Sequence, residues 1–202
     1  MRPSRRFVTL VAVALTTVLA LPGLSRAATT EVAVDDDFFS PGVATIALGD
    51  SVHWSRAGGS NGNHNVAEVS GIFRSGDPTT GAIDLTVVFS AGSFRYWCEI
   101  HSPDMDGTIA VPVKIRSAPS GLPFTVAWAS LSTTSGSKWD IQYKVGNGLW
   151  RNWKTDTTSF KGVFGKRNVP VRVVAGRTYR FRARSQSGTA TSLWAPVRSF
   201  RA

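Results

Sequence analysis

Residues 96–107 read Tyr-Trp-Cys-Glu-Ile-His-Ser-Pro-Asp-Met-Asp-Gly and place Cys98, His101 and Met105 within eight positions of one another. The aromatic residues before the cysteine alternate along the chain, which predicts a strand, and the Ser-Pro-Asp run predicts a tight loop. A loop of this size lets a thiol, an imidazole and a thioether reach one point. Because both sulfurs are soft ligands, this stretch indicates a site for an ion such as copper.

A second imidazole lies upstream of this stretch. The run Asn-His-Asn-Val at residues 63–66 follows a loop rich in Gly, Ser and Asn and offers His64. Two histidines and one cysteine, with a weak axial methionine, form the ligand set of an electron-transfer copper site. A lone cysteine is usually a small buried hydrophobe, and Met105 could simply pack in its loop. An exported protein exposes a spare thiol to oxidation, however, so the pattern around Cys98 favours copper.

These motifs resemble the cupredoxin family of plastocyanin- and azurin-like blue (type 1) copper proteins, over roughly residues 31–113. Cys98-x2-His101-x3-Met105 lies within the range of ligand-loop lengths in that family, and His64-Asn65-Val66 looks like its upstream His-Asn-Val. The resemblance implies a Greek-key β-sandwich that binds one copper ion. It further implies that His64, Cys98 and His101 are equatorial ligands, that Met105 is the axial ligand, and that Asn65 ties the two ligand loops together.

The resemblance also implies where electrons would leave. In the family the edge of the downstream histidine, here His101, is the usual electron port. Trp97 stands where a smaller aromatic residue is more usual, and it is a hypothetical second route. Glu99 and Asp104 flank the site, but their oxygens are hard ligands, so we expect them to set surface charge.

The histidine count predicts an electron carrier and not an enzyme. The chain has 3 His and 1 Cys, and His53 alternates with Val52 and Trp54 on a predicted strand, which favours a structural role. Too few ligands remain for a second copper site, and the single thiol excludes a disulfide framework. Two alternatives stay open: a non-redox surface or cell-wall binding protein on a cupredoxin-like scaffold, and a copper storage or delivery protein.

The first 27 residues resemble a signal peptide. Arginines precede an apolar run over residues 7–21, and Ser-Arg-Ala at residues 25–27 supplies small residues at the expected cleavage position. The run is shorter than the roughly 18–20 residues that a membrane span requires. We therefore expect a secreted or periplasmic protein without a membrane span.

Charge divides the remaining chain into two parts. Residues 28–115 carry 4 basic and 11 acidic residues, a net of −7, whereas residues 116–202 carry 15 and 2, a net of +13. The Pro/Gly/Ser-rich residues 116–121 predict a linker between two domains. No segment after residue 28 keeps a helical apolar period over three turns, so both domains are predicted to be all-β.

Residues 122–202 resemble a fibronectin type III domain, a second β-sandwich. The resemblance rests on Trp128, on alternating residues 139–145 and 176–184, and on the Ser-Leu-Trp-Ala-Pro run at residues 192–196. Alternating Val169, Val171 and Val173 predict one further strand of this domain.

The arginines of residues 180–184 alternate with apolar residues and are predicted to form a cation–π ladder with Trp194. The remaining basic excess offers a surface for an acidic cell-wall polymer or for the unidentified redox partner, and no nucleic acid is expected. Trp150 and Trp153 flank Arg151, and sandwich packing is favoured for them over sugar stacking.

Overall fold

The computed structural model describes residues 27–57, 62–117, 122–130 and 136–202, and these residues form strands, turns and loops without a helix. The predicted all-β class is confirmed. The described residues contain no helix long and apolar enough to cross a membrane. The signal-peptide prediction, up to residue 26, and residues 118–121 of the predicted linker lie outside the described residues.

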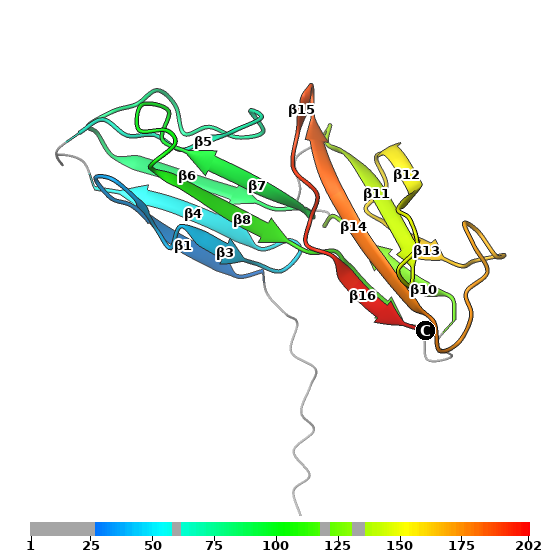
Figure 1. The fold of residues 1–202 in the computed structure, drawn as a ribbon. Coiled ribbons are helices and arrows are strands. Elements are labelled where there is room, and N and C mark those ends of the chain that lie inside the picture. The colour runs from blue at the N-terminus through cyan, green and yellow to red at the C-terminus, as the bar shows by residue number, and fades with distance from the viewer. Residues whose placement is uncertain (1–26, 58–61, 118–121, 131–135) are drawn as a thin grey trace, which may run out of the picture.

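The first sandwich consists of two sheets, with strand orders β2-β1-β4-β6 and β3-β8-β7-β5 (Figure 1). Its strands are β1 (Thr29–Val34), β2 (Phe39–Ser40), β3 (Val43–Thr45), β4 (Ser51–Arg56), β5 (Ala67–Glu68), β6 (Ile83–Val88), β7 (Gly92–Trp97) and β8 (Asp106–Val111). Alternate residues of β7 and β8 are buried, as expected for sheets that each turn one face to a shared core.

Aromatic side chains dominate the core of the first sandwich. Trp54 from β4 and Tyr96 from β7 are fully buried, and their ring centroids lie 5.2 Å apart in an edge-to-face arrangement. Phe73 and Phe89 pack against the same indole, at 5.2 and 6.1 Å. Because Trp54 and Tyr96 come from opposite sheets, this cluster joins the two layers and fixes the strand that leads to Cys98.

The second sandwich also has two sheets, ordered β13-β10-β9 and β12-β11-β14-β15, with β16 paired to β14. Its strands are β9 (Lys114–Ser117), β10 (Phe124–Ala127), β11 (Lys138–Val145), β12 (Arg151–Thr157), β13 (Lys161–Phe164), β14 (Thr178–Ser187), β15 (Ala190–Thr191) and β16 (Arg198–Arg201). Phe124, Phe164 and Phe181 meet in its core, with ring centroids 4.9 to 5.8 Å apart.

The passage between the sandwiches differs from the sequence prediction. The first domain was expected to end at residue 115 and a linker to begin at residue 116. Instead, β9 pairs with β10, so Lys114 to Ser117 belong to the second sandwich. Val113 and Ile115 pack against the core of that sandwich, and burial of these apolar side chains explains the earlier start.

The strand predicted over Val169, Val171 and Val173 is wrong. Among these residues only Val169 makes a β-bridge, to Lys166, and residues 170–174 form a bend and loop. Pro170 interrupts the run and has no backbone N–H to donate to a neighbouring strand. The apolar alternation instead places Val171 and Val173 against the core from a loop.

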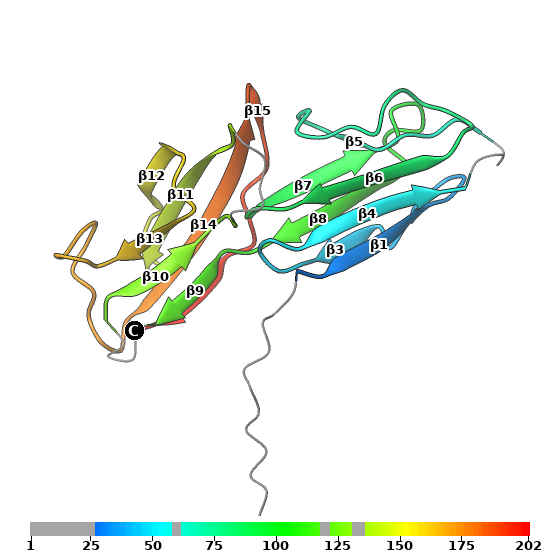
Figure 2. The ribbon, with the colours of Figure 1, turned by 180° about the vertical axis from the view of Figure 1, so that it is seen from behind.

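The two sandwiches meet through buried hydrogen bonds at the start of β7. Ser90 Oγ and Ser185 Oγ lie 2.7 Å apart, and the Ser185 hydroxyl is 3.0 Å from the carbonyl oxygen of Ala91. The Ala91 N–H donates to the Trp128 carbonyl at 2.7 Å. Cys98 follows the opposite end of β7, and strand geometry of about 3.3 Å per residue places it roughly 20 Å away. The loop over residues 98–105, beyond the end of β7, therefore lies far from the second sandwich (Figures 1 and 2).

Candidate metal centre

Backbone hydrogen bonds shape the loop that follows β7. The Cys98 N–H donates to the Met105 carbonyl at 3.1 Å, and the Met105 N–H donates to the His101 carbonyl at 3.1 Å. The His101 N–H in turn donates to the Cys98 carbonyl at 3.2 Å. This folds residues 98–105 back on themselves, so that three side chains spaced along the sequence share one end of the sandwich.

His64 reaches the same point from the connection between β4 and β5. Its backbone N–H and carbonyl both pair with Thr79, at 3.0 and 2.9 Å, in an isolated antiparallel bridge. Asn65 and Val66 follow as fully buried residues that lead into β5. The backbone of His64 is thus held by two hydrogen bonds to Thr79.

The structure brings the four predicted ligands together. One ligand atom from each of His64, Cys98 and His101 lies within 4.8 Å of the others. His64 Nδ1 is 3.3 Å from Met105 Sδ, and the two imidazole centroids are 4.6 Å apart. Among the described residues this is the one group of at least three His, Cys, Asp or Glu side chains that converges in this way.

The burial and chemistry of this cluster fit a copper ion. His64, Cys98 and Met105 are fully buried, and His101 is half-buried. His101 Nδ1 is buried and has no hydrogen-bond partner among the described residues. An orphaned buried nitrogen is costly unless something satisfies it, and a metal ion would. Two imidazoles, a thiol and a thioether are soft or intermediate donors, which suit copper and not Mg²⁺ or Ca²⁺.

Asn65 and Glu99 brace the two ligand loops against each other. The Glu99 N–H donates to Asn65 Oδ1 at 2.9 Å, and Asn65 Nδ2 donates to Glu99 Oε2 at 2.7 Å. Asn65 Nδ2 also reaches the carbonyl of Gly76 at 2.9 Å. The side chain of Asn65 therefore joins the segment after His64 to the residue after Cys98.

A bidentate ion pair extends this brace. Arg74 donates to both carboxylate oxygens of Glu99, at 3.0 and 2.6 Å. The hydrogen bonds from Arg74, and then from Asn65, lower the pKa of Glu99. Glu99 was expected only to set surface charge, whereas the structure gives it a structural role in the brace. Asp104, the other flanking carboxylate, is exposed.

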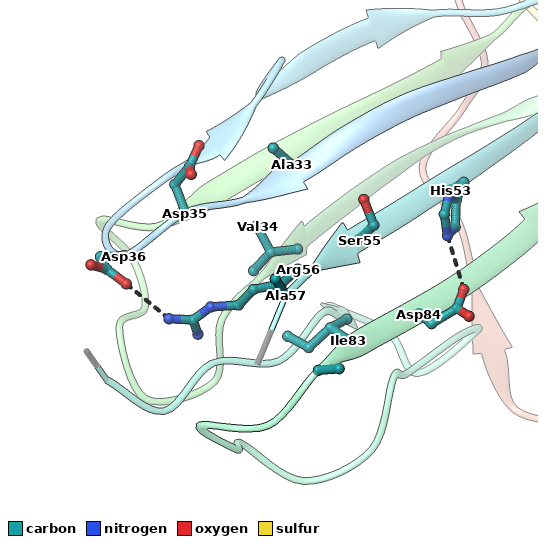
Figure 3. A pocket seen from close by; sticks show the side chains of 11 residues that line it. Ala33, Val34, Asp35, Asp36, His53, Ser55, Arg56, Ala57, Ile83 and Asp84 are labelled. Carbon is teal, nitrogen blue, oxygen red and sulfur yellow. Dashed lines mark hydrogen bonds and ion pairs between the residues drawn. The ribbon is translucent and has the colours of Figure 1, made fainter. Parts of the chain in front are cut away.

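The surroundings of His64 favour its neutral form. Burial lowers the pKa of His64, and the positive charge of Arg56 lowers it further. Arg56 Nη2 donates to Asp36 Oδ1 at 2.8 Å, as Figure 3 shows, and the same carboxylate oxygen lies 4.0 Å from His64 Nε2. A neutral imidazole is the form that binds metal ions.

His53 lies outside the cluster. Its Nε2 is 2.9 Å from Asp84 Oδ1 (Figure 3), and its Nδ1 is 2.6 Å from Glu31 Oε2, so both ring nitrogens are engaged. His53 and Asp84 line a cavity of about 660 Å³ to which none of the four predicted ligands contributes. Both carboxylates raise the pKa of His53, Asp84 more than Glu31. These contacts agree with the structural role expected for His53.

The residues that form the arginine ladder of the second sandwich differ from those predicted. Arg182 stacks between the rings of Trp150 and Trp194, at 4.3 and 4.6 Å, and Arg184 lies 4.8 Å from Trp194. Arg180, by contrast, donates to the Gly146 carbonyl. Trp150 joins the ladder because β11 and β12 bring it beside β14, a placement that sequence spacing alone does not reveal.

The two tryptophans that flank Arg151 have different roles. Trp153 packs inside the sandwich against Trp128 and Phe164, at 5.7 and 5.1 Å. Trp150 lies on the outer face in the ladder. The predicted sandwich packing is therefore confirmed for Trp153 and wrong for Trp150, whose ring stacks on Arg182 outside the core.

Comparisons with known proteins find no matching family model and no matching curated protein. Solved structures similar to this chain include amicyanin from Paracoccus versutus, with 27% identity over 45% of this chain and 85% of that one and a TM-score of 0.33. The reduced state of an amicyanin mutant matches with 22% identity, 46% and 96% coverage and a TM-score of 0.35. The Cu(I) form of another amicyanin mutant matches with 22% identity over 44% of this chain and 85% of that one, and with a TM-score of 0.35.

Proposed function

We propose that this protein is an exported type 1 copper protein that binds one copper ion and transfers single electrons. The observation that carries the proposal is the convergence of His64, Cys98 and His101 within 4.8 Å, with Met105 Sδ 3.3 Å from His64. Copper supplies a one-electron change between Cu(I) and Cu(II) when it is bound. Met105 would supply a thioether ligand.

The chain's own residues would keep this centre rigid and dry. The hydrogen-bonded loop holds Cys98, His101 and Met105, while the Asn65–Glu99–Arg74 brace holds that loop against the segment after His64. If the site is to change little between oxidation states, its ligands must be held in place. Hydrogen bonds around the ligands, such as these, orient them. Full burial of His64, Cys98 and Met105 excludes water from three of the four donors.

Electron exchange is proposed to occur at His101. It is half-buried, whereas the other three predicted ligands are fully buried, so His101 is the one of the four with the most exposure to solvent. A redox partner would therefore dock over the loop after β7. A carrier also accounts for all 3 His of the chain, because two are in the cluster and His53 is bound to carboxylates.

The proposal includes export and a fibronectin type III-like second domain. Export is supported by the charged, apolar and small-residue order of residues 1–27. The second domain is supported by its two antiparallel sheets and by the motifs in residues 122–202. In this proposal the second sandwich contributes none of the four ligands of the metal centre.

Titration with Cu(II) tests the function directly. The wild-type protein is expected to bind one equivalent and to develop an intense blue thiolate charge-transfer band. Cys98→Ser should lose the band, while the matched control Asp104→Asn, in the same loop but exposed, should keep it. Reversible one-electron voltammetry would then support a carrier, and an irreversible response would favour storage or delivery. A colourless wild-type protein would refute the proposal.

A further inference from the structure

The outer face of the sheet β13-β10-β9 carries a cluster of cations. β10 is the middle strand, and its Ala127 pairs with Lys114 of β9 on one side and with Lys161 of β13 on the other. One step along the sheet, Thr125 pairs with Arg116. Figure 2 shows the three strands side by side.

The strand alternation directs these side chains away from the core. Phe124 and Val126, the alternate residues of β10, are buried, so Thr125, Ala127 and their partners lie on the opposite face. Lys114, Arg116 and Lys161 are indeed exposed. Adjacent strands are about 4.8 Å apart, which separates the backbones of Lys114 and Lys161 by about 10 Å across an alanine.

Short side chains in the middle strand make this face concave. A groove of about 460 Å³ is lined by Thr125 and Ala127 and by the three cations, together with Ser117. Its remaining lining residues contain neither a carboxylate nor an aromatic ring. The result is a trough with small side chains on its floor and positive charge on both sides.

The three cations are not neutralised within the described part of the chain. None of them takes part in the ion pairs found there, which elsewhere engage Arg56, Arg74, Arg95 and Arg184. Like charges that face each other across a trough repel and lower stability. An arrangement that costs stability without an internal partner points to an external anion.

We propose that this groove binds an acidic polysaccharide, a linear sugar polymer that carries carboxylate or sulfate groups. The cations would pair with the anionic groups, and the hydroxyl of Thr125 would hydrogen-bond to a sugar hydroxyl. Single-stranded nucleic acid is disfavoured because the groove has no aromatic ring for base stacking. A folded protein partner is disfavoured because the groove has no aromatic ring and gathers two lysines, whereas the core of a protein interface is enriched in aromatic residues and depleted of lysine.

The position of the groove suits an anchor. Its lining comes mainly from β9, β10 and β13, and Leu48 of the first sandwich also contributes. The loop over residues 98–105 follows the end of β7 that is remote from the junction (Figures 1 and 2). A polymer held in the groove would leave His101 open to a redox partner. This inference does not depend on whether copper binds.

The test compares two triple variants of the whole protein that lose the same charge. The groove variant is Lys114→Gln, Arg116→Gln and Lys161→Gln. The control variant is Lys138→Gln, Lys154→Gln and Arg198→Gln, which removes the same two lysines and one arginine from exposed positions elsewhere on the second sandwich. Binding to polygalacturonate is measured for both, with neutral dextran as the polymer control and circular dichroism to verify folding.

The groove variant is expected to bind polygalacturonate about tenfold to a hundredfold more weakly, because each exposed pair contributes a factor of about two to five. The control variant should lose less than about threefold, through the general field alone. Equal losses in both triples, or no loss in the groove variant, would overturn the proposal. Tighter binding of polyglutamate or of duplex DNA than of polygalacturonate by the wild type, or equal binding of dextran, would overturn it as well.

Discussion

The two sandwiches share an architecture and differ in where they keep their polar chemistry. The first is acidic overall and gathers two imidazoles and two sulfurs inside the loops at one end, largely out of contact with water. The second is strongly basic and displays its cations on sheet faces, stacked on indoles or around a groove. Loop ends can converge on a point, which suits an ion, whereas a sheet face spreads charges in rows, which suits an extended polymer.

The largest expected effect is the difference in unfolding free energy between truncating a buried and an exposed tryptophan. Trp54→Ala removes a fully buried ring that joins both sheets of the first sandwich, and it should cost about 3–5 kcal/mol of unfolding free energy. Trp150→Ala, on the outer face of the second sandwich, should cost about 1 kcal/mol through lost cation–π contacts. Urea denaturation followed by circular dichroism measures both. Equal costs would show that Trp54 is not the centre of its core.

The brace around the metal centre gives the next largest effect. Asn65→Ala removes the side-chain contacts between the two ligand loops, so copper affinity should fall by about tenfold to a hundredfold while the blue band remains. Competition with a copper chelator measures the change. Asp104→Asn serves as the control, and an Asn65→Ala protein with unchanged affinity would remove Asn65 from the site.

The junction between the sandwiches should contribute a smaller, measurable stability. Ser185→Ala leaves the Ser90 hydroxyl and the Ala91 carbonyl without this buried partner, at a cost of about 1–2 kcal/mol. Ser199→Ala, an exposed position on β16, is the matched control and should be neutral. The thermal unfolding midpoints of both variants decide the matter, since equal midpoints would mean that the junction adds nothing.

The smallest effect is a pH dependence at His53. Asp84 and Glu31 raise the pKa of His53 in the folded protein above its usual value near 6.5. The protonated ring therefore stabilises the fold fully below about pH 6.5, and this contribution is lost as the pH rises through the raised pKa. His53→Gln should flatten the change in urea midpoint between about pH 6 and pH 9. A wild-type midpoint that rises over this range relative to the variant would contradict the direction.

Sequence alone could predict what is local or periodic. Cys98, His101 and Met105 share one loop, so their spacing was enough to suggest a common point, and alternation was enough to predict the all-β class. His64 lies far upstream, and it was predicted as a ligand from the Asn-Val residues that follow it and from the family resemblance.

What depends on strand register could not be predicted. The Arg74–Glu99 ion pair joins segments that are 25 residues apart, with no periodicity to mark it. Likewise, Lys114 and Lys161 flank the same alanine only because β9 and β13 both pair with β10. The start of the second sandwich at β9 was not predicted, because it depends on the burial of single residues. The loop at Pro170 was not predicted, because it depends on one absent backbone N–H.

X-ray absorption at the copper edge of the loaded protein most directly tests whether one thiolate and two imidazoles share an ion. The spectrum should require one short copper–sulfur bond and two imidazole nitrogens, and Cys98→Ser should remove that sulfur. A first shell made only of oxygen and nitrogen, the same in the wild type and in Cys98→Ser, would contradict the account.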